Sequence, residues 1–361
     1  MRRVRITLFL TTLILICIGV VMIYSSSSIY ALENLGDTNY YLKRQLIYLG
    51  IGCLLTLLVM GFDYKLLKKY AKPILIASLV LMALVLVLGK EAGGAKRWFR
   101  AFGLSFQPSE LMQVSLIIYL ADFIARKKNL MLDFWRGFVP PLLLLGGACL
   151  LVLVQPDLGT ALLLVFITFI MLIVSGVRLS YIGLCISGLI PAFYLLIFRV
   201  PYRRMRILAF LNPWLDPQGS GFQLIQSQIA LASGGIVGLG LGQSRQKLFY
   251  LPAAHTDFIF SIIAEELGLF GALLVVVLFV MFISQAALIS RNSGDTFGKF
   301  LSLGILSMIG LKACINIGAS LGFLPTKGLP LPFISYGGTS LVFDMICVGL
   351  LLNISRSGEY P

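Results

Sequence analysis

The chain has 361 residues and a formal net charge of +14, and 58% of its residues are hydrophobic while only 12% are charged. Soluble domains hold roughly 45–50% apolar and about 25% charged residues, so a water-soluble fold could not bury this much apolar surface. The composition therefore excludes a soluble protein. It indicates a membrane protein, and we expect no nucleic-acid partner.

Apolar runs long enough to cross a hydrocarbon core of roughly 30 Å recur along the whole chain. We expect helical spans at 6–28, 46–62, 73–89, 108–125, 137–154, 158–175, 180–198, 258–284, 299–322 and 337–354. The first run follows three arginines as a secretory signal does, but it is long for a signal core and is assigned as the first anchor. The cysteines lie inside apolar runs without metal-ligand spacing and are expected to pack.

The predicted fold is an all-α integral membrane protein of about ten transmembrane helices, in one domain over 1–361. A large extracytoplasmic loop, 199–257, separates helices 7 and 8. Basic residues resist translocation, and the N-terminus and the short loops after spans 2 and 4 are basic, so both termini are expected to be cytoplasmic. The basic residues of the outer loop suit either lipid head groups or an anionic substrate such as a lipid-linked pyrophosphate.

The first outward motif precedes the fourth span. Lys96 and Arg97 stand in a loop that leads to Pro108, Ser109 and Glu110. Proline suits a first helical turn, and serine and glutamate favour a helix N-terminus by capping and by complementing the helix dipole. Helix initiation does not account for the two cations.

Asp157 lies in a tight outward turn at the start of the sixth span, where capping and substrate contact are both open interpretations. The loop 199–257 then holds spaced glycines between 234 and 242. They follow no predicted strand, so a dinucleotide site is rejected. We expect these glycines to allow unusual dihedrals and close backbone approach in a re-entrant or surface-lying segment.

The loop ends at His255 and Asp257. His255 is the only histidine, so a zinc site is not expected. Asp257 directly precedes the eighth span, and its residue type alone favours a helix cap.

Several acids and one lysine fall inside predicted spans. Glu265 and Glu266 lie about 12–13 Å below the start of span 8 at 1.5 Å per residue. Lys312 and Asp344 lie at similar depth, and ionised groups there need partners. We therefore predict that Lys312 pairs with Glu266 or Asp344. The Pro- and Gly-rich segment 324–340 should form a rigid apolar lip above the last span.

Taken together, these segments resemble the SEDS family (shape, elongation, division and sporulation), whose members include RodA, FtsW and SpoVE. The motifs GAKRWF, FQPSE, QPDLGTA, GSGFQLIQSQIA, GLGQSRQKLFYLPAAHTDFIFSIIAEELG and PTKGLPLPFISYGGTSL follow one another in family order over essentially the whole chain. The TKGL form resembles the division and sporulation branch. The family usually has lysine where this chain has Gln113 and glutamine where it has Lys312. Either the charge has moved between helices that serve one cavity, or this pair is misaligned.

The resemblance implies an inverting peptidoglycan glycosyltransferase that polymerises lipid II at the outer face of a bacterial cytoplasmic membrane, during cell division or sporulation. The acceptor hydroxyl would attack the anomeric carbon of a pyrophosphate-linked donor without a covalent enzyme intermediate. The alternatives are a lipid II flippase and a non-catalytic scaffold for a transpeptidase. Expected partners are a class B penicillin-binding protein and divisome or sporulation proteins.

The resemblance also implies the site. The family's essential acid matches Asp257, which would serve as the base. Lys96, Arg97, Arg245 and Lys247 are the candidate cations for the pyrophosphate. The remaining predicted substrate-binding residues are Glu110, Asp157, His255 and Lys312. No cofactor is required by the sequence, although Mg²⁺ or Mn²⁺ could share the pyrophosphate charge.

Overall fold

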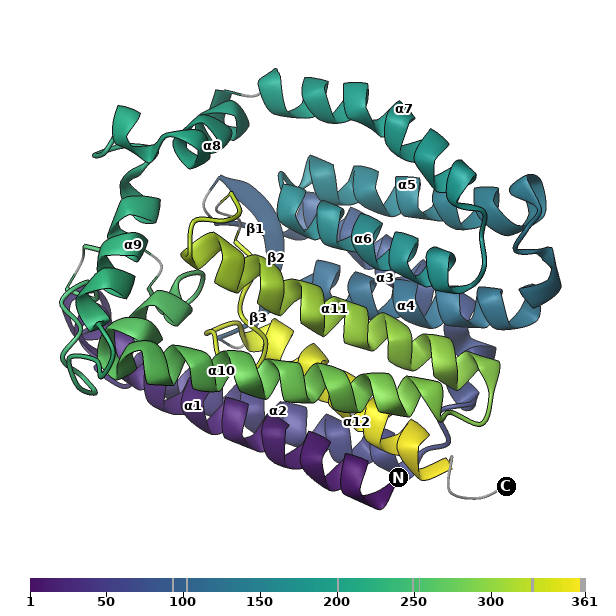
Figure 1. The fold of residues 1–361 in the computed structure, drawn as a ribbon, viewed down its shortest axis with the longest axis horizontal. Coiled ribbons are helices and arrows are strands. Elements are labelled where there is room, and N and C mark those ends of the chain that lie inside the picture. Colours follow the sequence, from purple (N-terminus) through teal and green to yellow (C-terminus); the bar gives the residue numbers. More distant parts are fainter. Residues whose placement is uncertain are drawn as a thin grey trace.

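A computed structural model describes residues 1–92, 94–101, 103–199, 201–248, 250–252, 254–325 and 328–357. The TKGL motif therefore lies partly outside the described residues, because Thr326 and Lys327 are not among them. The fold is a bundle of long helices with a smaller helical layer over one side (Figure 1).

The long helices match the ten predicted spans. They are α1 (Arg2–Leu35), α2 (Tyr40–Gly61), α3 (Leu66–Leu88), α4 (Pro108–Arg126), α5 (Val139–Val154), α6 (Leu158–Val174), α7 (Leu179–Phe198), α10 (Ile259–Arg291), α11 (Thr296–Ser320) and α12 (Gly338–Ser357). Within the described residues, eight helical segments are long and apolar enough to cross a membrane, and α6 and the first part of α7 are shorter apolar helices. The all-α membrane fold is confirmed.

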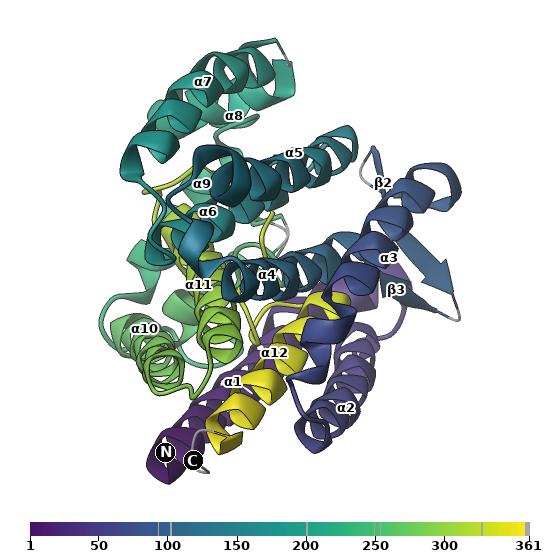
Figure 2. The same ribbon diagram turned by 90° about the vertical axis from the view of Figure 1, so that its right-hand side faces the viewer.

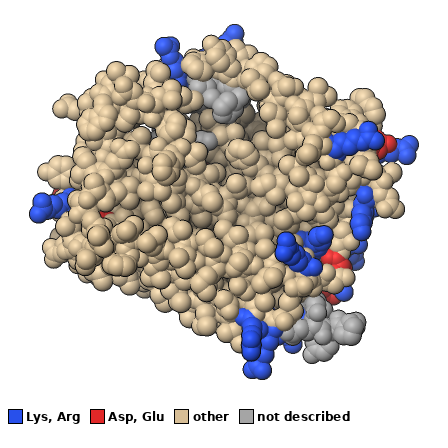
Figure 3. Space-filling model, viewed as in Figure 1, with Lys and Arg blue, Asp and Glu red and all other residues tan. Residues whose placement is uncertain are grey.

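The centre of the bundle is formed by α4 and α12. In their most apolar stretches 83% and 89% of the residues are buried, whereas in α1, α2, α3 and α10 the figure is 39% or less. Those four helices therefore lie at the outside of the bundle, with many apolar side chains exposed. Charged side chains lie around the ends of the molecule, and the visible face between them carries almost none (Figure 3). This belt is the surface expected of a bundle in a bilayer.

A small antiparallel sheet connects α3 and α4. It contains β1 (Lys90–Ala92), β2 (Ala95–Ala101) and β3 (Leu104–Phe106), in that order. The hydroxyl of Tyr48 in α2 accepts a hydrogen bond from the Ser105 amide at 2.6 Å, which ties the sheet to the bundle. The expectation of a simple loop around Lys96 and Arg97 was therefore incomplete. Strands this short give little periodic signal in a sequence.

The loop 199–257 is partly helical. It contains α8 (Pro201–Leu211), a short 3₁₀ turn at Pro213–Leu215 and α9 (Phe222–Gly234), followed by the glycine-rich segment. The start of α1 and the end of α12 lie together at one end of the bundle (Figures 1 and 2), and α9 lies at the opposite end. The loop and the termini thus occupy opposite ends, as the predicted topology requires.

Helix α10 is broken at Gly268, whose φ of 66° and ψ of −163° are not helical. The segment 235–240 fills the break. Two of its amides donate to the carbonyl oxygens of Glu265 and Glu266 at 3.0 and 2.9 Å. A Cβ atom on Gly238 or Gly268 would overlap the backbone opposite. The expected close backbone approach is confirmed, and it satisfies polar groups that a broken helix would leave unpaired in a membrane.

We predict that Gly268→Ala destabilises the protein. Alanine has a Cβ atom that overlaps segment 235–240, and a backbone in this glycine-only region costs about 1–3 kcal/mol for other residues. Thermal unfolding in detergent should show a lower midpoint than wild type. Gly50→Ala in α2 is the control, because nothing lies within 4 Å of a Cβ atom there. Equal midpoints for the two variants would contradict the proposed packing.

Candidate functional site

Asp257 does not cap a helix. The N-cap of α10 is Phe258, and no side chain caps that helix. The interpretation of Asp257 as a cap is therefore wrong: the chain turns into the helix one residue later. Its carboxylate is partly exposed and remains available for other contacts.

The backbone around Asp257 is held by a buried amide that the sequence did not single out. Asn316 of α11 donates from Nδ2 to the carbonyl oxygens of both Asp257 and Leu329, each at 2.9 Å. It thereby joins the carboxylate-bearing segment to the apolar lip. An asparagine about one helical turn from Lys312 in an apolar span was the available signal.

The lip adds further hydrogen bonds on the same segment. The Ser335 hydroxyl donates to the Thr256 carbonyl at 2.5 Å, and the Tyr336 amide donates to the His255 carbonyl at 2.9 Å. A Cβ atom on Gly328 would stand 3.2 Å from a carboxylate oxygen of Asp257. The predicted rigid lip thus positions the segment and leaves space beside its carboxylate.

Two charged residues influence Asp257 from other elements. Burial raises the pKa of the Asp257 carboxyl to about 6, while the Arg206 guanidinium and a side-chain hydrogen bond with Thr256 oppose the rise. The negative charge of Asp157 adds to the rise. Arg206 of α8 is one of the basic residues of the loop 199–257, and the fold places its charge near enough to act on this carboxyl.

Asp157 is a helix cap. Its carboxylate accepts the Thr160 amide at 3.0 Å and the Thr160 hydroxyl at 2.9 Å, at the start of α6. Arg97 of β2 donates to the carbonyl oxygens of Gln155 and Pro156, both at 2.6 Å. These hydrogen bonds fasten the sheet to the turn that carries Asp157. They give Arg97 a structural role that requires no bound ligand.

The other predicted pyrophosphate cations differ in their surroundings. Lys96 and Arg245 are exposed. Lys247 is buried, and its amine contacts a carboxylate oxygen of Glu266 at 3.1 Å, the Gly242 carbonyl at 2.7 Å and the Ser25 hydroxyl at 3.2 Å. An ammonium has three donors, so these partners use them all.

The acids below Asp257 anchor the loop. Glu266 pairs with Lys247 and also accepts the Ser25 hydroxyl at 2.6 Å. Glu265 accepts the Ser244 hydroxyl and the Arg245 amide, the latter at 2.9 Å. Both acids are buried and bound to segment 242–247 or to α1. Glu266 is therefore not the partner of Lys312.

Lys312 is the centre of a buried ion triad. Its amine lies 2.8 Å from Glu110 of α4 and 3.2 Å from Asp344 of α12, and 3.4 Å from the Ser340 hydroxyl. The predicted pairing with Asp344 is confirmed. Glu110 lies in the first turn of α4, as expected for a helix start, and its side chain is buried against Lys312. Gln113, one turn further along α4, is buried with both amide atoms unpaired.

His255 lies among tyrosines. Its ring centroid is 4.5 Å from Tyr41, 5.7 Å from Tyr30 and 5.9 Å from Tyr336. Burial lowers the pKa of the imidazole to about 4, so it is neutral at pH 7. Within the described part of the chain, no three His, Cys, Asp or Glu side chains are grouped to hold a metal ion.

Comparisons with known proteins match the whole chain. The family model FTSW_RODA_SPOVE, described as "Cell cycle protein", matches residues 5–360. A probable peptidoglycan glycosyltransferase FtsW of Geobacter metallireducens is 44% identical over 98% of this chain and 95% of its own length. Stage V sporulation protein E of Bacillus subtilis is 42% identical, with 98% and 97% covered.

Solved structures share the fold. One chain, from work described as "Structural coordination of polymerization and crosslinking by a peptidoglycan synthase complex", has a TM-score of 0.80 and 30% identity, with 98% of both chains covered. The rod shape-determining protein RodA of Thermus thermophilus has a TM-score of 0.73 and 28% identity, with 98% of this chain and 97% of that chain covered.

The ion triad generates a stability prediction. Lys312→Gln should lower the free energy of unfolding by about 3–5 kcal/mol, because two buried carboxylates lose their cation. Adding Glu110→Gln and Asp344→Asn should recover part of this loss. Lys299→Gln, at an exposed position of the same helix, is the control. Thermal unfolding of purified protein measures all of them, and a Lys312→Gln midpoint equal to that of Lys299→Gln would contradict the triad.

Proposed function

The chain belongs to the FtsW, RodA and SpoVE family, and we propose that it is a peptidoglycan glycosyltransferase that polymerises lipid II into glycan strands. The observation that carries the proposal is the Asp257 carboxylate, which caps no helix and stands beside Arg206 and Thr256. It lies in an outer segment fixed by α11 and the lip. A base that receives a proton from a sugar hydroxyl needs a fixed position and a carboxylate that is not used as a helix cap.

The reaction uses Asp257 as the general base. The acceptor hydroxyl attacks the anomeric carbon of the donor, its proton passes to a carboxylate oxygen of Asp257, and the bond from that carbon to the pyrophosphate breaks. The configuration at the carbon inverts, and no enzyme-bound sugar forms. A pKa near 6 supports the role, because general bases work best when their pKa lies near the operating pH.

Positive charge is needed where the pyrophosphate leaves. Arg206 lies close enough to act on Asp257, and Lys96 and Arg245 are exposed cations of the outer segments. We propose that these three residues stabilise the leaving group. Lys247 and Lys312 would instead act on structure, since their amines are bound within the chain. Mg²⁺ or Mn²⁺, if used, would arrive with the pyrophosphate.

The protein is a multi-pass membrane protein. We propose that it lies in the bacterial cytoplasmic membrane with both termini in the cytoplasm, since the N-terminus and the short loops after the second and fourth spans are basic. We further propose a class B penicillin-binding protein as transpeptidase partner, together with division or sporulation proteins. The likeness to a chain of a peptidoglycan synthase complex supports a synthase partner.

Asp257→Asn tests the function. The variant should fold normally and lose at least about 99% of lipid II polymerisation, because an amide cannot accept the proton and general bases contribute roughly 10²–10⁴-fold. Purified protein with labelled lipid II and its partner gives the rate, and thermal unfolding gives the fold. Asp216→Asn, an exposed acid of the same loop, is the control. A folded Asp257→Asn variant that polymerises at the wild-type rate would favour a flippase or scaffold.

The polymerisation rate should also depend on pH. Protonated Asp257 cannot act as a base, so the rate should fall about tenfold per pH unit below about pH 6 and level off above it. Arg206→Gln removes a cation that lowers this pKa, so its midpoint should move to higher pH. A wild-type profile that is flat between pH 5 and 7 would contradict the assignment of the base.

A further inference from the structure

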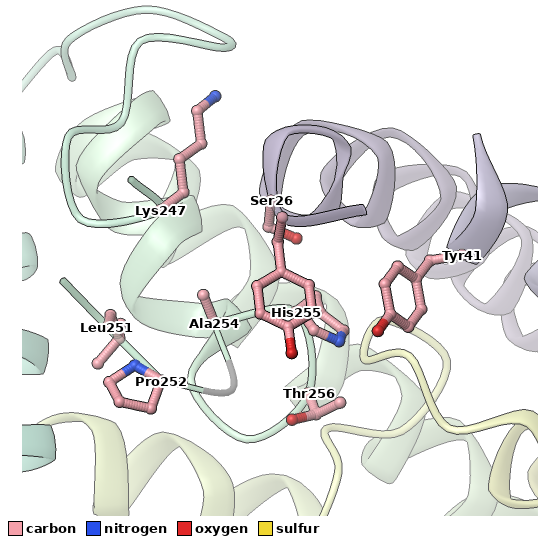
Figure 4. Close-up of a pocket in the computed structure, with 9 residues that line it drawn as sticks. Ser26, Tyr41, Lys247, Leu251, Pro252, Ala254, His255 and Thr256 are labelled. Atoms are coloured by element: carbon pink, nitrogen blue, oxygen red, sulfur yellow. The ribbon is translucent and has the colours of Figure 1, made fainter. Parts of the chain in front are cut away.

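A cavity of about 410 Å³ opens beside the outer ends of α1 and α2 (Figure 4). Ser26 and Tyr30 of α1, Tyr41 of α2, and His255 and Thr256 of the segment before α10 line it. The volume falls within the roughly 300–1,000 Å³ of small-molecule sites. Neither the base nor the proposed leaving-group cations account for this cavity.

Three aromatic side chains line the cavity, together with the apolar side chains of Leu251, Pro252 and Ala254. The rings of Tyr30, Tyr41 and His255 form a contiguous group, and the pKa of His255 is low enough to leave it uncharged. Lys247 also lines the cavity, but its side chain extends away from the rings (Figure 4) and its amine is bound to Glu266. The cavity is therefore unsuited to a pyrophosphate.

Aromatic faces beside hydroxyl groups suit a sugar ring. The C–H face of a pyranose is apolar and packs on aromatic rings, while its hydroxyl and acetamido groups need hydrogen-bond partners. Ser26, Thr256 and the two tyrosines, which all line the cavity, carry hydroxyl groups. A neutral N-acetylated pyranose matches both properties.

Thr256 connects this cavity to the base. Its side chain lines the cavity and shares a hydrogen bond with the Asp257 carboxylate. A sugar that contacts Thr256 is therefore one side chain from the group that would take its proton. Arg206 acts on the same carboxylate from α8, which does not line the cavity.

We propose that this cavity is the subsite for the acceptor sugar, with Tyr30 and Tyr41 as its aromatic platform. The leaving pyrophosphate of the donor binds on the Arg206 side of Asp257. The assignment deepens the proposed function and rests on it. The donor and the acceptor are chemically alike, and in this assignment they bind at separate places around the Asp257 carboxylate.

The test measures binding without turnover, in the Asp257→Asn protein in lipid nanodiscs. One probe is a soluble N-acetylated disaccharide that lacks lipid and phosphate, and the other is inorganic pyrophosphate. Tyr41→Ala and Tyr30→Ala should each weaken disaccharide binding about tenfold and leave pyrophosphate binding unchanged. Arg206→Gln should do the reverse. Saturation-transfer NMR and calorimetry give the two affinities.

Tyr24→Ala is the matched control, since Tyr24 is an exposed tyrosine of α1 outside the cavity. Tyr41→Phe keeps the ring and should retain most of the affinity if the alanine variant fails to fold. Unchanged disaccharide affinity in folded Tyr30 and Tyr41 variants, or no disaccharide binding to the parent protein, would overturn the subsite. Polymerisation by the Asp257→Asn variant would contradict the proposed function, whatever the disaccharide-binding measurements show.

Discussion

The structure depends on one constraint, which is that charged side chains inside an apolar helical bundle must be paired. An ionised side chain inside a membrane protein is costly unless a partner lies beside it. Glu265 and Glu266 meet this need by binding the outer loop, and Glu110 and Asp344 meet it through Lys312. The buried acids thus fix the elements that surround the site. Asp257 differs from them because its carboxylate is partly exposed and has no ion-pair partner within salt-bridge distance among the described residues.

The spans were predictable because each depends only on a local run of apolar residues. The helix cap at Asp157 was one of two predicted roles, the other being substrate contact, because capping also depends only on the local sequence. The partners of Lys312 were predictable only in part. Depth along the helices indicated Asp344, but it did not indicate Glu110, nor that Glu266 is bound to Lys247. The Lys247–Glu266 ion pair depends on how the loop 199–257 folds back onto α10, and no local sequence pattern predicts that.

The site depends even more on contacts between distant segments. Asn316, Arg206 and Tyr41 come from three different helices and converge around 255–257. Lys312 reaches Glu110 across the contact between α11 and α4, and Gln113 lies unpaired one turn away on α4.

The broken helix α10 has a consequence for how the protein is made. The segment 235–240 precedes α10 in the chain, so it is synthesised before the helix residues with which it pairs. Its amides can find Glu265 and Glu266 only after α10 has been inserted. The segment and α10 therefore complete their folding together, and the segment stays unpaired until the helix is in place. Placement of the segment that carries Asp257 is thereby coupled to insertion of α10.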